Sequence, residues 1–288
     1  DSQIGNPDKA LTYYKSQAQW SLETQYGIGY ILFNKQSYKE AIGYFQKAIQ
    51  MDNLELQNDA RVRLADCLYA TKSYGEALEL YTRINRNNAS AYVYLQRGLA
   101  LKATGKRTQA IESFKLAEAD QQYGRLSLFQ LGLIYFESSQ FETSIPAFSK
   151  VIEIGKKDDI HARALLNRGL AYKNTDEFRM AKTDFIAVLD DHISSDIALN
   201  AILGLQELQV HVEVDQFDEY LTSFRNAHPE EQSLEDIDLE TAKRFYFNEN
   251  FESAISTLNQ FMKAYPNSIH ANEVRYYLAE SYFKVESL

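Results

Sequence analysis

The side chains that could do chemistry in this chain are few and scattered. They are five histidines and one cysteine: His161, His192, His211, His228, His270 and Cys67. A metal site needs several such ligands at short, regular spacings, and no two of these histidines stand four residues apart. A single cysteine allows no intramolecular disulfide, and we expect Cys67 to be a small buried side chain. The sequence therefore predicts no metal and no cofactor.

One segment, ATGKRT (103–108), invites comparison with a phosphate-binding loop. That loop needs four residues between its two glycines and a Ser or Thr after the lysine. Here Gly98 and Gly105 have six residues between them, and Arg107 stands at the hydroxyl position. No G-x-S-x-G nucleophile motif is present either. We interpret the segment as a turn and predict that the chain is not an enzyme.

What does recur is a small residue four positions before a large one. The small residues are Ala41, Ala77, Ala110, Ser144, Ala181 and Ala254, and the large ones are Phe45, Tyr81, Phe114, Phe148, Phe185 and Leu258. The first four intervals are 36, 33, 34 and 37 residues, and the last, 73, leaves room for two units. Twelve residues upstream of each stands another small residue: Gly29, Ala65, Gly98, Gly132, Gly169 and Ala242. Such a period is typical of an array of helical hairpins.

Two segments show the pattern most clearly, YGIGYILFNKQSYKEAIGYFQKAIQMD (26–52) and FQLGLIYFESSQFETSIPAFSKVIEI (129–154). They resemble tetratricopeptide repeats, in which Leu-Gly and Tyr on a first helix precede Tyr, Ala and Phe on a second. The resemblance spans nearly the whole chain. It implies an all-α, right-handed superhelical solenoid of about seven hairpins, with half a repeat at each end.

We place the repeats by this pattern at 22–55, 58–90, 91–124, 125–158, 162–196, 197–230 and 235–268. The sixth is degenerate, because Tyr220 replaces its small residue. A lone helix over 7–20 precedes the array, and a half repeat over 270–288 follows it. We expect residues 1–288 to form a single solenoid and to be a fragment of a longer array.

Composition limits the partners. The formal net charge is −10 and the pI is near 5.1, which argues against nucleic-acid binding. No run approaches the roughly 18 apolar residues of a membrane span, and no lysine and arginine cluster is present to hold an anionic membrane. We therefore expect a protein or peptide partner.

Side chains turned away from the paired helix should line the inner wall of the superhelix. In this chain they include an aromatic stripe, which we define as Tyr26, Tyr30, Phe33, Tyr69, Phe129 and Phe136. Tetratricopeptide domains that bind acidic C-termini carry Lys and Asn on this wall, whereas Tyr26 and Tyr30 stand at the first such pair here. We expect a partly exposed stripe that binds an apolar peptide or helix. Packing against the neighbouring first helix is the alternative for any one of these residues.

A finer resemblance concerns FMKAYPNSIHANEVRYYLAESYF (261–283). It is similar to repeats of bacterial cell-envelope proteins, including outer-membrane assembly lipoproteins, and so implies a bacterial protein of the periplasm. A cytoplasmic adaptor is the competing interpretation. The function we expect is a protein-interaction scaffold, with envelope assembly as its setting. The alternative is a helical accessory or regulatory domain of a larger enzyme or transporter system.

Overall fold

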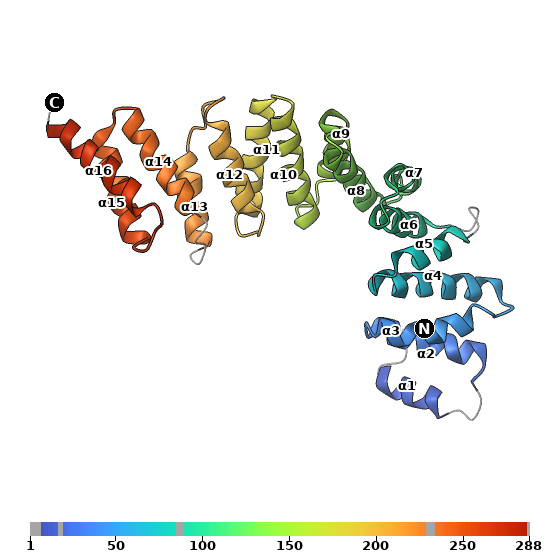
Figure 1. The fold of residues 1–288 in the computed structure, drawn as a ribbon. Helices are drawn as coiled ribbons and strands as arrows, with labels where there is room; N and C mark the ends of the chain where they lie inside the picture. The colour runs from blue at the N-terminus through green and yellow to red at the C-terminus, as the bar shows by residue number, and fades with distance from the viewer. Residues whose placement is uncertain (1–6, 17–19, 85–88, 229–233, 287–288) are drawn as a thin grey trace. The chain divides into compact units, whose positions relative to one another are not determined.

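The computed structural model describes residues 7–16, 20–84, 89–228 and 234–286. Within these ranges the chain forms sixteen α-helices and no strand (Figure 1). The predicted fold class, an all-α solenoid of helical hairpins with half a repeat at each end, is confirmed.

In chain order fourteen of the helices fall into seven successive pairs, each with a first and a second helix. The first helices are α2 (Leu22–Asn34), α4 (Leu54–Ala70), α6 (Ala91–Ala103), α8 (Gly124–Glu137), α10 (Asp159–Asn174), α12 (Ala198–Leu208) and α14 (Glu235–Phe247). The second helices are α3 (Tyr38–Ala48), α5 (Tyr74–Thr82), α7 (Arg107–Ala117), α9 (Phe141–Glu153), α11 (Phe178–His192), α13 (Phe217–Ala227) and α15 (Phe251–Ala264). Helix α1 (Pro7–Lys15) precedes the pairs and α16 (Ala271–Glu286) follows them.

The chain divides into two compact units, residues 1–171 and residues 172–288. In the first unit each helix from α2 to α8 packs on the next (Figure 1). Successive first helices also touch, because α2 contacts α4, α4 contacts α6, and α6 contacts α8. In the second unit α11 packs on α12, α12 on α13, α14 on α15, and α15 on α16. Each unit therefore buries its apolar surface between neighbouring hairpins, as repeat arrays do.

The recurring small residues explain how the two helices of a pair approach each other. An ideal Cβ on Gly98 would lie 2.5 Å from a ring carbon of Phe114, and one on Gly29 would lie 3.0 Å from Phe45. Both phenylalanine rings are fully buried. The ring of the second helix thus fills the space that the glycine of the first helix leaves.

The turn between the helices of a pair has a fixed backbone feature. In six of the seven pairs the residue two before the second helix has a positive φ. These residues are Gln36, Lys72, Gly105, Ser139, Asp176 and Glu249. In the sixth pair the connection is longer and the positive φ falls on Gln216, directly before α13. The turn conformation therefore recurs although only one of the six residues is a glycine.

Candidate protein-interaction surface

Three residues of the aromatic stripe close the turn of their own hairpin. Each stands four residues after the small residue of a first helix, and its ring packs on the first residue of the second helix. The centroid distances are 5.6 Å for Phe33 and Tyr38, 5.0 Å for Tyr69 and Tyr74, and 5.2 Å for Phe136 and Phe141. All three stripe residues are half-buried. Hairpin packing therefore takes up much of their apolar surface.

Two further stripe residues lie three positions before the small residue and face the second helix. The ring of Tyr26 lies 6.1 Å from that of Phe45, and the ring of Phe129 lies 6.0 Å from that of Phe148. Tyr26 is half-buried, whereas Phe129 is only 7% exposed. The expectation that Phe129 is partly exposed is wrong, because its ring is buried in a cluster with Phe148 and Val151 of α9 and Ala164 of the next first helix, α10.

Tyr30 is the exposed member of the stripe. It follows Gly29 on α2, 40% of its surface is accessible, and its ring lies 5.9 Å from that of Tyr26. The equivalent places on the next three first helices hold Asp66, Leu99 and Leu133. Tyr30 therefore presents a large aromatic side chain to solvent from a rigid helix.

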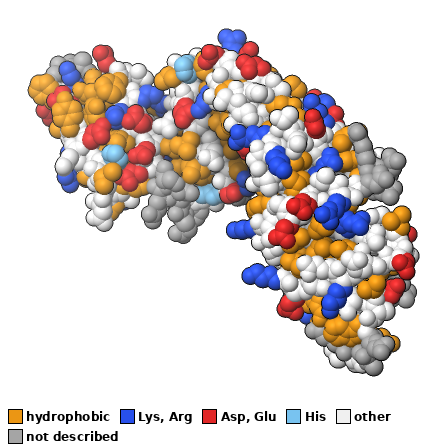
Figure 2. Space-filling model, turned by 45° about the vertical axis from the view of Figure 1, so that its right-hand side comes forward, with side chains coloured by type: hydrophobic (Ala, Val, Ile, Leu, Met, Phe, Trp, Pro, Cys, Tyr) orange, Lys and Arg blue, Asp and Glu red, His pale blue; other side chains and the backbone are white. Residues whose placement is uncertain are grey.

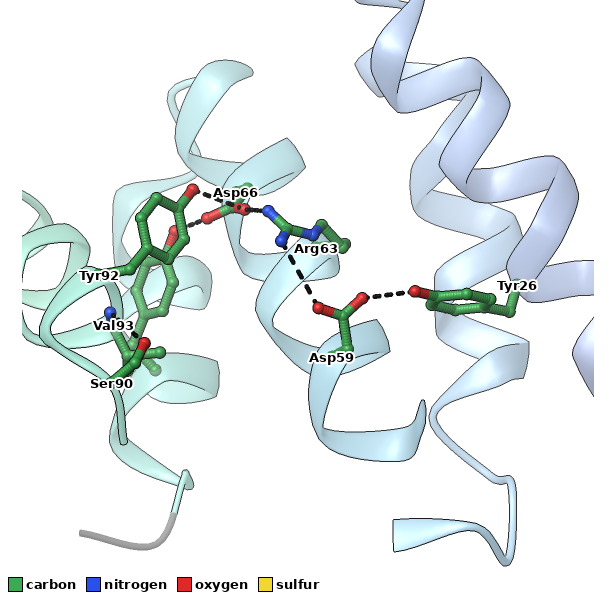
Figure 3. A network of polar contacts seen from close by, with 8 residues as sticks. Tyr26, Asp59, Arg63, Asp66, Ser90, Tyr92 and Val93 are labelled. Atoms are coloured by element: carbon green, nitrogen blue, oxygen red, sulfur yellow. Dashed lines mark hydrogen bonds and ion pairs between the residues drawn. The ribbon is translucent and has the colours of Figure 1, made fainter. Parts of the chain in front are cut away.

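A polar network lies beside Tyr30 on helices α4, α5 and α6, and Figure 3 shows most of it. Asp66 of α4 is 8% exposed and accepts three hydrogen bonds: from Tyr81 at 2.6 Å, from Tyr92 at 2.9 Å and from Arg63 at 3.0 Å. We call these four residues, together with Asp59, the Asp66 network. Three donors satisfy a carboxylate that would otherwise be costly to bury.

The network continues to α2 through a second carboxylate. Tyr26 donates to Asp59 Oδ2 at 2.7 Å, and the Arg63 guanidinium lies 3.5 Å from Asp59 Oδ1 (Figure 3). The Arg63 guanidinium carbon also lies 5.5 Å from the ring centre of Phe33 and 5.7 Å from that of Tyr92. Both distances are within the range of cation–π attraction. Arg63 of α4 therefore contacts one aromatic ring of α2 and one of α6, and joins the three helices.

Burial dominates the acid–base behaviour of these groups. Desolvation raises the pKa of the Asp66 carboxyl, although its three donors act in the opposite direction. Desolvation likewise raises the pKa of the Tyr81, Tyr92 and Tyr26 hydroxyls, which remain protonated donors. Cys67, buried as expected, has its pKa raised by desolvation to about 12 and is held as a thiol.

The Asp66 network was not predicted from the sequence, although the repeats contain the information. The second repeat has Tyr81 where the first, third, fourth and fifth have phenylalanine, and Asp66 where its neighbours have leucine or tyrosine. A hydroxyl and a carboxylate that appear together in one repeat, at two places that face each other, predict a buried hydrogen bond.

The fold defines a class of protein, the helical-repeat scaffold of protein–protein interactions. Two tetratricopeptide-repeat models match the chain, one at residues 26–92 and the other at 91–118, 127–158 and 162–190. Together they cover more than half of the sequence. The chain belongs to the tetratricopeptide-repeat family, whose members are generally non-enzymatic scaffolds.

Solved structures agree on the fold. The C-terminal part of a tetratricopeptide-repeat protein from Cytophaga hutchinsonii is 18% identical, with a TM-score of 0.70 over 86% of this chain and 98% of that one. A tetratricopeptide-repeat protein from Parabacteroides merdae is 14% identical, with a TM-score of 0.57 over 90% and 98%. YrrB, described as having an unusual peptide-binding site, is 18% identical, with a TM-score of 0.52 over 68% and 96%.

The C-terminal part of the chain has a second likeness. The YfiO family model, described as an outer membrane lipoprotein, matches residues 202–287. No curated protein matches the sequence. Within the ranges that the structure describes, no helix combines the length and apolarity that crossing a bilayer requires.

Proposed function

We propose that this chain is a scaffold that binds an apolar peptide or helix of a partner protein on its first-helix surface, with Tyr30 at the centre of the contact. The observation that carries the proposal is the exposure of Tyr30 beside the Asp66 network. Tyrosine and arginine are the residue types that concentrate binding energy at interfaces. Tyr30, Tyr26 and Arg63 lie together there on neighbouring first helices.

The charge of this surface supports an apolar partner. Arg63 is paired with Asp59 and Asp66, so its own charge is compensated and it offers no free cation to a carboxylate. Tyr26 and Tyr30 occupy the places that would otherwise begin a carboxylate clamp. Recognition would then rest on stacking and on burial of apolar area, with hydrogen bonds from the tyrosine hydroxyl.

The setting that we propose is the bacterial envelope, where the partner would be a component of envelope assembly and the chain would act in the periplasm. The support is the match of residues 202–287 to an outer membrane lipoprotein model. This match concerns the second unit, whereas Tyr30 and the Asp66 network belong to the first. The two parts of the proposal are therefore independent of each other.

A selection experiment tests the class of partner. A random peptide library displayed on phage is selected against residues 1–288, and the same selection is run against the Tyr30→Ala variant. We expect the wild-type chain to enrich peptides rich in aromatic and aliphatic residues, and the variant to lose them. Enrichment of acidic peptides, or of the same peptides by both chains, contradicts the proposal.

A further inference from the structure

Four tyrosines follow one another across the first helices of the first unit. Tyr26 and Tyr30 lie on α2, Tyr92 lies on α6, and Tyr123 directly precedes α8. Tyr30 is 40% exposed, and the other three are half-buried. We call these four residues the tyrosine row. Because α1 packs on α2 and α9 packs on α8, the row lies within the array of helices.

Contacts link the row from one helix to the next. The rings of Tyr26 and Tyr30 lie 5.9 Å apart. The rings of Tyr92 and Tyr123 lie 5.3 Å apart. Arg63 of α4 connects the two pairs, because its guanidinium carbon lies 5.7 Å from the ring centre of Tyr92 and it interacts electrostatically with Tyr30. Figure 3 shows Tyr26, Arg63 and Tyr92 on three successive first helices.

The row offers hydrogen-bond donors. Two of its hydroxyls already donate to the carboxylates of the Asp66 network, which Arg63 also engages. The other two hydroxyls, of Tyr30 and Tyr123, have no hydrogen-bond partner among the residues that the structure describes. The nearby carboxylates are therefore occupied, whereas two hydroxyls are free to donate. A ligand rich in carbonyl groups and poor in N–H groups fits such a surface.

The charges around the row favour an uncharged ligand. Arg63, between the two tyrosine pairs, is itself paired with Asp59 and Asp66. On the face of the first unit that Figure 2 shows, acidic and basic side chains are interspersed with each other and with hydrophobic ones. Interspersed charges of both signs give a ligand of either sign little net attraction. Recognition by the row then depends on ring contacts and on the hydroxyl donors.

The spacing of the helices matches one extended conformation of a peptide. Successive first helices from α2 to α8 are in contact. The axes of packed helices lie about 8–10 Å apart. A polyproline II helix rises about 3.1 Å per residue and repeats every three residues, so it advances about 9 Å per turn. A β-strand presents the same face every two residues, about 7 Å, and does not keep this register.

From these observations we infer that the tyrosine row binds a proline-rich segment of a partner protein in the polyproline II conformation. The inference rests on the proposed function and names the kind of apolar peptide that binds there. Proline has no N–H, so such a segment presents carbonyl groups to the Tyr30 and Tyr123 hydroxyls and aliphatic rings to the tyrosine faces. Its conformation is formed before binding, which reduces the entropy lost on binding.

Titration calorimetry of residues 1–288 with synthetic peptides tests the inference. One peptide repeats Ala-Pro-Pro over about four turns, and its mirror image is built from D-amino acids. The two have the same composition but polyproline II helices of opposite hand, so the L-peptide should bind at least about tenfold more tightly. An amphipathic helix of leucine and glutamine is the comparison peptide.

Tyr123→Phe separates the row from a contact at Tyr30 alone. This variant removes one free hydroxyl and keeps the ring beside Tyr92, so the L-peptide should bind about threefold more weakly through the loss of a hydrogen bond. Tyr44→Phe is the matched control, because it removes a hydroxyl from the second helix α3, outside the row, and should leave the dissociation constant unchanged. An unchanged dissociation constant for Tyr123→Phe overturns the inference.

The peptides also distinguish a failure of this inference from a failure of the proposed function. Equal binding of the two mirror images overturns the inference, and so does binding of the amphipathic helix alone. If that binding is lost in Tyr30→Ala, the proposed function still stands. Binding of none of the three peptides overturns the inference too, and the phage selection then decides the proposed function on its own.

Discussion

The ring of Phe148 fills the space beside Gly132 that any side chain there would need. A Cβ on Gly132 would lie 2.5 Å from Cε1 of Phe148, closer than such atoms approach in real structures. Gly98 and Phe114 are related in the same way, also at 2.5 Å. The distance between the two helices of a hairpin is therefore set by one ring packed against one bare backbone position.

Replacing Gly132 by leucine should destabilise the chain by at least about 2 kcal/mol, because the added carbons overpack the contact with Phe148. Gly43→Leu is the matched control. Gly43 also lies within a helix, but nothing comes within 4 Å of its Cβ position, so leucine there should stabilise by about 0.8 kcal/mol through helix propensity. Urea unfolding followed by circular dichroism measures both. Equal effects at the two glycines would contradict this account of hairpin packing.

The positive φ in the turns predicts that Gly105→Ala and Lys72→Gly change the free energy of unfolding in opposite directions. Gly105 has φ of 76° and open space around it, so Gly105→Ala should cost about 1 kcal/mol through backbone strain alone. Lys72 occupies the equivalent place with φ of 67°, so Lys72→Gly should raise the free energy of unfolding. Thermal unfolding of both variants tests this, and a loss of stability in Lys72→Gly would speak against it.

The sequence alone predicted most of the fold, because the contact between a glycine and a ring recurs at a fixed spacing. Gly29 and Phe45, Gly98 and Phe114, and Gly132 and Phe148 are each sixteen residues apart. Each such pair identifies a first helix, a second helix and the turn between them. The pattern could not disclose the division of the chain into two compact units, since this depends on how each hairpin packs on the next.

The sequence was less informative about the surface. It showed the aromatic stripe, but not that three rings of the stripe pack on the first residue of the second helix. Phe136 and Phe141 illustrate this, because their contact depends on the path of the turn and not on a helical spacing. Tyr30 stays exposed because it lies one residue after Gly29, where its side chain faces neither the second helix nor the turn.

The bond between Tyr81 and Asp66 predicts a stability coupling. Tyr81→Phe should cost about 1–3 kcal/mol, because it removes a donor from a buried carboxylate while leaving the ring in place. Asp66→Leu introduces the leucine that other repeats carry at this place. The double variant should therefore lose less free energy of unfolding than the two single variants lose in total. Additive effects in a double-mutant cycle would show that the hydroxyl contributes nothing through Asp66.

Asp158 predicts a pH dependence with a definite sign. Arg125 donates two hydrogen bonds of 2.7 Å to it, and these lower the pKa of the carboxyl below its ordinary value. A lowered pKa in the folded chain means that the stabilisation is present above about pH 4 and is lost as the pH falls through the folded pKa. Asp158→Asn should therefore cost about 1–2 kcal/mol at pH 7 and progressively less in acid.

Asparagine can still accept the bond from the His161 amide, so this variant isolates the charge of Asp158. The neighbouring Asp159→Asn is the control. Its pair with Arg163 is more exposed, and its loss should change the free energy of unfolding by at most about 0.5 kcal/mol at any pH. A cost for Asp158→Asn that does not vary between pH 7 and pH 3 would refute the assignment.

The most direct test of the proposed function is the affinity of Tyr30→Ala for a peptide selected by the wild-type chain. If Tyr30 is the centre of the contact, its truncation should weaken binding by about 2 kcal/mol, roughly thirtyfold, with helicity unchanged. Leu116→Ala removes an exposed apolar side chain from the second helix α7 and should leave the affinity unchanged. Titration calorimetry of the three chains decides the matter. A dissociation constant for Tyr30→Ala within about twofold of the wild-type value would contradict a recognition surface centred on Tyr30.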